Sequence, residues 1–409
     1  MKSKLFTAAL AALVLASCAP KENGYFDNLP QEASPIEIGN KITNRFLEQG
    51  HSQYGSPLRV NEPRTQITYP DVCTWLGGLW FAQETDNKDL TERLKARFEP
   101  LFTNEAYLQP KPNHVDNNVF GAVPLELYLQ TGEERYKTLG MMYADSQWEL
   151  PANWKLEEGE ERQSSMYGDF KDADICQPEQ KEWDDKGYSW QTRFWLDDMY
   201  MITTIQAQAY RVTNDRKYID RAAREMVLYL DSIQQPSGLF YHAPTAPFCW
   251  GRGNGWILMT LVDLMELLPE NDENYPYLEA SLTQKLNTLY PLQDEKTGHW
   301  YQLPIYPGEE GNFIESSSTA MYAYAAAKGI ALGILPADKY MPMIDRAYAG
   351  LEANSLQPVG KYLKMKNICD GTCIGDKDYY YNRGIVNERA YAFGIAAMFY
   401  DQYHQLTAK

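Results

Sequence analysis

The stretch WLDDMYMITTIQAQAYRVTNDRKYIDRAAREMVLYLDSI, residues 195–233, contains the structural unit from which the rest of the chain is built. Apolar side chains recur at three- and four-residue spacing over 195–211 and again over 217–233, which predicts two helices. Between them, TNDRKY (213–218) provides a polar turn that ends one helix and begins the next. The stretch therefore predicts a hairpin of two helices.

The same unit recurs along the chain. Helical periodicity is also present over 74–98, 119–145, 256–268, 319–333, 339–353 and 385–404. Polar turns similar to TNDRKY occur at ETDNKDL (84–90), TGEERY (131–136), LPADKY (335–340) and, in degenerate form, LPEN (268–271). The longer aromatic connections SGLFYHAP (237–244) and TGHWYQLP (297–304) also resemble each other. Such internal repetition indicates a repeat architecture.

Helix pairs with short polar turns and long aromatic loops predict an all-α fold, a closed (α/α)6 barrel with the long loops at one mouth. The inner helices of such a ring begin beside the long loops, so we expect functional side chains to gather there. An open α-solenoid is the alternative, and it would bind along a concave face. The irregular spacing of the repeats favours closure and a single catalytic domain over 41–409.

The composition of the 409-residue chain excludes several classes of protein. A formal net charge of −17 argues against a nucleic-acid-binding protein, because phosphate groups require a positive surface. The chain has no collagen-like glycine period and too few cysteines for a disulfide scaffold. Aromatic residues make up 13% of the chain, and those outside the core can line a groove for ring-shaped, polyhydroxylated ligands.

The N-terminus resembles a bacterial export signal. A basic head precedes an apolar run over 5–14 that is too short to span a membrane. LASC (15–18) resembles a lipobox, in which Cys18 is lipidated and becomes the first mature residue. We expect a signal peptide over 1–17, a tether over 18–40, and a protein anchored by lipid on the periplasmic or outer face of the cell envelope. An ordinary signal peptide, cut nearby, is the alternative.

The remaining cysteines do not form a framework. Their number is odd and they are spread widely, at Cys73, Cys176, Cys249, Cys369 and Cys373. The last two lie in CDGTC and form either a local bridge or two free thiols. A zinc site would need two more soft ligands at matching spacing, and the sequence contains none, so no metal is expected.

Polar residues interrupt three apolar helix starts, at NHVDNN (113–118), WQTRFWLDDMYM (190–201), and His242 with WGRGNGW (250–256). Asp116 and Asp197 occupy equivalent positions in two repeats, so ring closure would bring them face to face. A general acid must hold its proton near neutral pH, which burial among aromatic rings and a second carboxylate favour. The alternative is that both aspartates only cap helix N-termini.

The third cluster is not a phosphate loop. GRGNG (251–255) lacks the Lys-Ser/Thr of a P-loop and the spacing of a dinucleotide fingerprint. It is better interpreted as a tight turn that presents Arg252, with a guanidinium fork for a carboxylate, and Trp256, with a face for a sugar ring. The alternatives are an Arg252 buried against an acidic helix end and a purely structural His242.

Taken together, WLDDMYM (195–201), YHAP…FCWGRGNGW (241–256), NHVDNN (113–118) and ESSSTAMYAYAAAKG (315–329) resemble the unsaturated uronyl hydrolases, the glycoside hydrolase family 105/88 group. The resemblance extends from about residue 40 to the C-terminus. It implies a barrel of six helix pairs. It also implies action on oligosaccharides that polysaccharide lyases leave with a 4,5-unsaturated uronic acid at the non-reducing end, without a metal or organic cofactor.

The resemblance also implies roles for particular residues. In that family an aspartate protonates the C4=C5 bond, water adds at C5, and the product opens and expels the sugar, unlike the usual two-carboxylate scheme. The motif W-x-D-x-x-x-M places this acid/base at Asp197, flanked by Trp195. The other matched residues are Asp116, which holds the reacting ring and water; His242, near the reacting centre; Arg252 and Trp256, which bind the uronate and wall the pocket; and, more weakly, Trp75, a stacking wall.

Two departures bear on the substrate. Asp116 is preceded by His114-Val115, where the glucuronyl branch has His directly before Asp, so the rhamnogalacturonyl-type branch is favoured. The stretch 146–190 is long and acidic, which is expected to reshape the subsites beyond the unsaturated sugar and to disfavour polyanionic tails.

Two other functions stay open from the sequence. A toroidal polysaccharide lyase or sugar epimerase would use His242, Arg252 and tyrosines, although a groove for a polyanion would be basic. A non-catalytic glycan-binding lipoprotein would share the anchor, the helices and the aromatic residues. The position of Asp197 distinguishes an enzyme from a binding protein. A position near Asp116 in a pocket indicates an enzyme, and a position on a rim beside stacked tryptophans indicates a binding protein.

Overall fold

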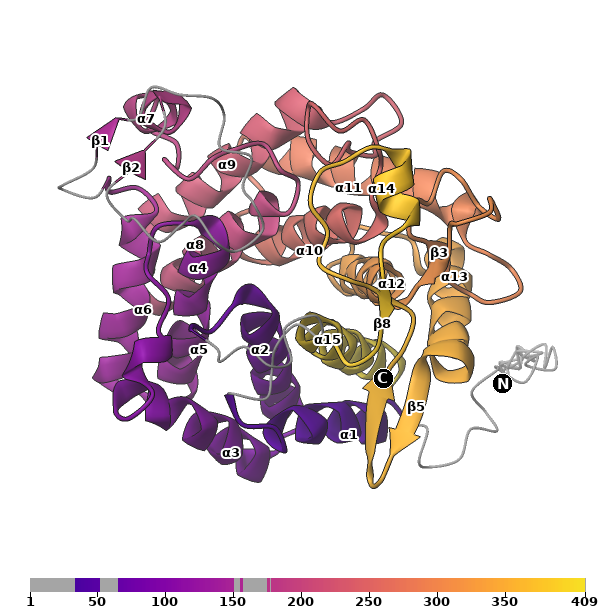
Figure 1. Ribbon diagram of the computed structural model, residues 1–409, viewed down its shortest axis with the longest axis horizontal. Helices are drawn as coiled ribbons and strands as arrows, with labels where there is room; N and C mark the ends of the chain where they lie inside the picture. Colours follow the sequence, from indigo (N-terminus) through magenta and orange to yellow (C-terminus); the bar gives the residue numbers. More distant parts are fainter. Residues whose placement is uncertain (1–33, 52–64, 151–154, 157–174, 177, 409) are drawn as a thin grey trace, which may run out of the picture.

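The computed structural model describes residues 34–51, 65–150, 155–156, 175–176 and 178–408. The predicted signal peptide, lipidation site Cys18 and most of the tether lie outside these residues. The described chain is predominantly helical, and its helices alternate between an inner and an outer ring (Figure 1). The predicted all-α fold, an (α/α)6 barrel, is confirmed.

The inner ring buries nearly all of its side chains. Its helices are α2 (Tyr69–Glu84), α5 (Ala122–Thr131), α8 (Asp198–Thr213), α10 (Gly251–Leu267), α12 (Ser316–Ala331) and α15 (Ala390–Thr407). Each packs against the next, and α15 packs against α2, so the ring is closed and not an open solenoid. Closure depends on a close approach of two glycines. A Cβ atom on Gly394 would lie 2.0 Å from the Cys73 carbonyl oxygen, and one on Gly77 would lie 2.2 Å from that of Gly394.

The outer ring covers the inner one with amphipathic helices. They are α1 (Pro35–Leu47), α3 (Lys88–Phe98), α6 (Glu134–Ser146), α9 (Arg216–Ile233), α11 (Tyr275–Leu289) and α13 (Ala337–Gly350). In α9, for example, Tyr218, Ala222 and Met226 are buried at four-residue spacing. The polar turns connect inner to outer helices at one end of the barrel, so every long connection lies at the other end, beside the N-termini of the inner helices.

Short elements fill these long connections. The short helices are η4 (Glu99–Phe102), η5 (Ala106–Leu108), α4 (Val115–Asn118), η6 (Val119–Gly121), α7 (Pro178–Asp185), η7 (Tyr290–Leu292), η8 (Leu351–Ser355) and α14 (Lys377–Tyr381). The strands pair as β1 (Lys155–Leu156) with β2 (Ile175–Cys176), β3 (Trp300–Tyr301) with β4 (Ile314–Glu315), β5 (Leu356–Val359) with β6 (Tyr362–Met365), and β7 (Ile368–Cys369) with β8 (Ile385–Val386). The first pair is parallel and the others are antiparallel.

One predicted helix begins later than its periodicity indicated. The pattern over 385–404 predicted helix throughout, but residues 385–386 form β8, and α15 begins at Ala390. The pairing of Val386 with Ile368 overrides the local pattern, and Glu388, with φ of 61°, turns the chain into the helix. The segment between β7 and β8, yellow in Figure 1, carries α14 and brings it over the mouth.

Within the described ranges, no helix has the length and apolar character needed to cross a membrane. Cys73, Cys249, Cys369 and Cys373 are free thiols, so of the two alternatives for CDGTC the structure has the unbridged one.

Candidate active site

Asp197 lies at the mouth of the barrel, at the N-cap position of α8. Its carboxylate Oδ2 is 3.2 Å from Nε2 of His242, and the Asp197 side chain is only 14% exposed whereas His242 is fully buried. The half-buried Trp195 packs edge-on against the imidazole, with ring centroids 5.7 Å apart. The structure therefore brings together Asp197, His242 and Trp195, which the sequence places in two separate repeats.

The imidazole of His242 is held at Nδ1 and at one ring face. Its Nδ1 is 2.7 Å from the Tyr380 hydroxyl, and its ring stacks on Trp250 at 4.7 Å between centroids. The His242 carbonyl accepts a hydrogen bond from the Leu196 amide, one residue before Asp197. Tyr380 comes from α14 and was missed by the sequence analysis, because no motif near it indicated that the C-terminal connection folds back onto the site.

This arrangement suits an aspartate that changes its protonation state. When Asp197 is ionised, His242 can donate from Nε2 while Tyr380 donates to Nδ1. When Asp197 is protonated, the imidazole can take the other tautomer, donate from Nδ1 to Tyr380 and accept at Nε2. The tyrosine hydroxyl can serve as donor or acceptor in turn.

Asp116 enters the same mouth from the short helix α4. The N-cap residue His114 accepts the Asp116 amide hydrogen at Nδ1, 3.2 Å away. Burial raises the pKa of the Asp116 carboxyl to about 6, the Arg193 guanidinium opposes this rise, and the Asp197 carboxylate adds to it. Asp116 and Asp197 are thus close enough to influence each other electrostatically.

Arg193 is a further charged residue of this site that the sequence analysis did not select. Its Nε donates to both carboxylate oxygens of Asp198, at 2.9 and 3.2 Å, and its guanidinium lies over the Trp195 ring, 4.4 Å from the centroid. Asp198 is fully buried and also accepts from the Tyr229 hydroxyl at 3.1 Å. The two adjacent aspartates thus differ: Asp198 anchors the loop, and Asp197 lies at the mouth. The signal available in the sequence was a single cation inside an acidic, aromatic stretch.

Arg252 lies in the buried wall of the barrel, and its contact with the uronate stays a prediction. It is fully buried, and its Nη1 and Nη2 donate to the carbonyl oxygens of Cys369 and Asp370 at 2.7 and 2.9 Å. The Glu315 carboxylate, at the N-cap of α12, lies 3.7 Å away. The structure therefore has the alternative arrangement, an arginine buried against an acidic helix end.

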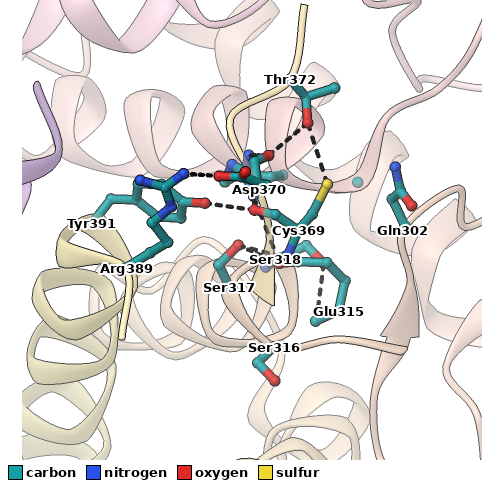
Figure 2. A network of polar contacts seen from close by, with 12 residues as sticks. Gln302, Glu315, Ser316, Ser317, Ser318, Cys369, Asp370, Thr372, Arg389 and Tyr391 are labelled. Atoms are coloured by element: carbon teal, nitrogen blue, oxygen red, sulfur yellow. Dashed lines mark hydrogen bonds and ion pairs between the residues drawn. The ribbon is translucent and has the colours of Figure 1, made fainter. Parts of the chain in front are cut away.

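A network of polar contacts around Glu315, Cys369 and Asp370 fastens the C-terminal connection to the barrel (Figure 2). The Cys369 amide donates to Glu315 Oε1 at 2.9 Å, and the Cys369 carbonyl accepts from the Tyr391 hydroxyl at 2.6 Å. Arg389 forms an ion pair with Asp370. Because Cys369 and Asp370 begin the segment that carries Tyr380, this buried network fixes the position of the tyrosine that orients His242.

The roles of Trp256 and Trp75 in walling the pocket stay predictions. Both are fully buried. Trp256 packs against Tyr200, with ring centroids 4.5 Å apart, whereas Trp75 packs edge-on against Phe98 at 5.5 Å. Both indoles belong to the barrel core, where periodicity alone cannot distinguish a core ring from a substrate-stacking ring.

The raised pKa of Asp116 predicts a gain in stability on its neutralisation. A carboxyl with a pKa near 4 when unfolded and about 6 when folded destabilises the protein as pH rises between these values. Asp116→Asn removes that cost. Because the side chain is 30% exposed, we expect the free energy of unfolding at pH 7.5 to increase by about 1–2 kcal/mol.

Urea unfolding of wild type and Asp116→Asn at pH 7.5 and at pH 4 measures this effect. The gain should fall below about 0.5 kcal/mol at pH 4, where the folded protein holds the proton and the unfolded chain is about half protonated. A variant that is less stable than wild type at pH 7.5 would contradict the expectation.

A closed α/α barrel whose mouth holds two carboxylates and an oriented histidine defines a barrel enzyme equipped for acid–base catalysis. The chain belongs to Glycosyl Hydrolase Family 88, whose family model matches residues 38–407. It is therefore a glycoside hydrolase, and the resemblance seen in its motifs is confirmed.

The chain is similar to named relatives at low identity. An unsaturated 3S-rhamnoglycuronyl hydrolase from Alteromonas sp. (strain LOR) is 24% identical over 350 residues, which cover 81% of this chain and 80% of the relative. An unsaturated rhamnogalacturonyl hydrolase from Bacillus subtilis (strain 168) is 24% identical over 196 residues, 46% of this chain and 52% of the relative. A family 105 glycoside hydrolase structure from C. acetobutylicum ATCC 824 superposes with a TM-score of 0.68 at 20% identity, over 89% of this chain and 99% of that one, and supports the fold.

Proposed function

We propose that this enzyme removes a 4,5-unsaturated uronic acid from the non-reducing end of oligosaccharides produced by polysaccharide lyases. The observation that carries the proposal is the Asp197–His242 pair, 3.2 Å apart at the mouth, in a chain of Glycosyl Hydrolase Family 88. The position of Asp197, buried against His242 and electrostatically coupled to Asp116, favours an enzyme over a glycan-binding protein.

The chemistry needs one acid/base group. The Asp197 carboxyl transfers its proton to C4, which leaves positive charge shared between C5 and the ring oxygen. Water adds to C5 and returns a proton to the Asp197 carboxylate. The resulting hemiketal at C5 opens, and the sugar bound at C1 then leaves. The reaction consumes one water molecule, and neither product is oxidised or reduced relative to the substrate. Asp116 supports the step by holding the ring and the water.

We propose rhamnose as the sugar in the adjacent subsite. Both named relatives are called rhamnoglycuronyl or rhamnogalacturonyl hydrolases, which supports this choice. The residues His114-Val115 before Asp116 give the same preference. We also propose that the protein is exported and anchored to the cell envelope by lipid on Cys18; the LASC sequence at 15–18 supports the anchor.

The proposed activity is tested with the purified mature protein and lyase-generated oligosaccharides from rhamnose-containing pectin, glucuronan-type and glycosaminoglycan sources. Loss of the ultraviolet absorbance of the conjugated C4=C5 bond is expected, fastest with the rhamnose-linked substrate. An unchanged absorbance on every unsaturated substrate would contradict the proposal, and a rise on an intact polysaccharide would indicate a lyase. Labelling with radioactive palmitate, with Cys18→Ser as control, tests the anchor.

A further inference from the structure

Asp116 and Asp197 belong to different repeats, so contacts elsewhere in the chain must set how the two carboxylates face each other. Asp116 lies in the short helix α4, whereas Asp197 ends the loop that leads into α8. Burial raises the pKa of the Asp116 carboxyl and the Asp197 carboxylate adds to this rise, so their separation matters to the protonation of the site. In a reaction that uses both groups, a displacement of about 1 Å can cost about 100-fold in rate.

A buried hydrogen bond joins the two segments directly. Asn118, the last residue of α4, is fully buried, and its Oδ1 accepts from Nε2 of Gln191 at 2.9 Å. Gln191 is 3% exposed and lies in the loop, six residues before Asp197. Asn118 in turn lies two residues after Asp116, within the same short helix. The bond therefore connects the backbone that carries one carboxylate to the backbone that carries the other.

The orientation of the Asn118 amide is fixed by the outer helix α6. Its Nδ2 donates to the carbonyl oxygen of Tyr143 at 2.9 Å and to the Ser146 hydroxyl at 2.6 Å. A carbonyl oxygen can only accept, so the amide nitrogen must face Tyr143 and the amide oxygen must face Gln191. Turning the amide over would break the bond to Tyr143 and the bond to Gln191 together, so the link has one geometry.

The loop that carries Gln191 docks on the same end of α6. Nε1 of Trp190 donates to the Ser146 carbonyl oxygen at 2.7 Å, and the Ser189 hydroxyl donates to the Gln147 carbonyl oxygen at 2.9 Å. The C-terminal end of α6 is therefore a common support for both aspartate segments, and the bond between the two amides fixes one segment against the other.

We propose that Asn118 and Gln191 are positioning residues whose hydrogen bond sets the separation of the two catalytic carboxylates. The inference rests on the proposed function, because only a reaction that uses both carboxylates depends on this separation. Both amides are buried and act through the aspartates, so they affect the chemical step and not the binding of substrate. Loss of the bond should therefore lower kcat and leave KM nearly unchanged.

The test removes the donor and measures turnover of the unsaturated oligosaccharide that wild type hydrates fastest. Gln191→Met keeps most of the side-chain volume but leaves Asn118 Oδ1 without its hydrogen bond. We expect kcat, followed by the loss of C4=C5 absorbance, to fall by about 30-fold, whereas KM should change by less than about threefold. Because a buried acceptor loses its partner, the urea midpoint of unfolding should also decrease.

Gln206 provides a matched control. It is fully buried, and its Nε2 donates to the Ala144 carbonyl oxygen at 2.7 Å and to Gln147 Oε1 at 2.9 Å, at the same end of α6. It lies within α8, nine residues beyond Asp197, and those hydrogen bonds join α8 to α6. Gln206→Met should therefore lower the urea midpoint to a comparable extent and keep kcat within about threefold of wild type.

A second substitution tests whether Gln191 acts through Asp116. In an Asp116→Asn background one of the two carboxylates is already absent, so their separation no longer matters. Gln191→Met should then lower kcat by less than about threefold, although it lowers kcat by about 30-fold when Asp116 is present. A residue that only supported the fold would lower kcat by the same factor in both backgrounds.

The outcomes separate the positioning role from the proposed function. If wild type is active while Gln191→Met keeps kcat within about threefold of wild type, the positioning role is overturned and the proposed function stands. An equal loss of kcat in Gln206→Met, or equal factors in the two backgrounds, overturns the positioning role as well. If wild type hydrates none of the unsaturated oligosaccharides, the proposed function fails and the positioning role fails with it.

A shorter amide keeps the test decisive if Gln191→Met does not fold. Gln191→Asn retains the polar group but is one methylene too short to reach Asn118, and Gln206→Asn is its control. The same loss of kcat is expected in Gln191→Asn alone, and an unchanged kcat in this variant overturns the positioning role.

Discussion

Asp197→Asn is expected to lower kcat by about 10³- to 10⁴-fold, close to the full contribution of a general acid/base. The amide has the size and shape of the carboxyl, whose Oδ2 lies 3.2 Å from His242 Nε2 in the wild type. It cannot give a proton to C4 or take one from water. Initial rates from the loss of C4=C5 absorbance measure the effect, and KM should change by less than about threefold.

The adjacent aspartate provides the control. Asp198 is fully buried and paired with Arg193, so Asp198→Asn leaves the guanidinium without its counter-charge. We expect it to lower the free energy of unfolding by about 3 kcal/mol, whereas Asp197→Asn should change it by less than about 1 kcal/mol. An Asp197→Asn enzyme that keeps a tenth of the wild-type kcat, or that unfolds as readily as Asp198→Asn, would contradict the assignment of the acid/base to Asp197.

Arg252→Met is expected to cause the largest loss of stability, about 3–5 kcal/mol in the free energy of unfolding. The substitution leaves the Glu315 carboxylate and the carbonyl oxygens of Cys369 and Asp370 without their buried cation. Methionine fills much of the space but donates no hydrogen bond. Urea unfolding followed by tryptophan fluorescence measures the loss.

The same variants distinguish an anchor from a substrate ligand. If Arg252 anchors the C-terminal connection, Arg252→Lys should be more stable than Arg252→Met. The kcat of Arg252→Met should be lower than that of wild type, because Tyr380 no longer holds His242. A direct ligand of the uronate would instead show a raised KM with unchanged stability. Lys88→Met, which breaks an exposed pair with Asp86, is the control and should cost less than about 1 kcal/mol.

Much of the site could be predicted because it lies in short local motifs. Asp197 and Trp195 are two residues apart, and Asp116 begins a helix at the equivalent position of another repeat. Equivalent positions of the repeats lie at the same end of the barrel, so the repeat pattern predicts one mouth for these residues. The fold class followed in the same way from apolar periodicity and recurring polar turns. These are local properties, determined within a few residues along the chain.

The sequence by itself therefore determined the helical repeats, the family and the pair of aspartates. Only the tertiary structure decided that Arg193 pairs with Asp198 and that Arg252 is fully buried. Arg252 and Arg193 both sit in aromatic stretches near helix starts, but Glu315 and the Cys369 carbonyl, more than 60 residues beyond Arg252, bury the first. Tyr380 reaches His242 across 138 residues for the same reason: burial and ion pairing depend on contacts that form only when the ring closes.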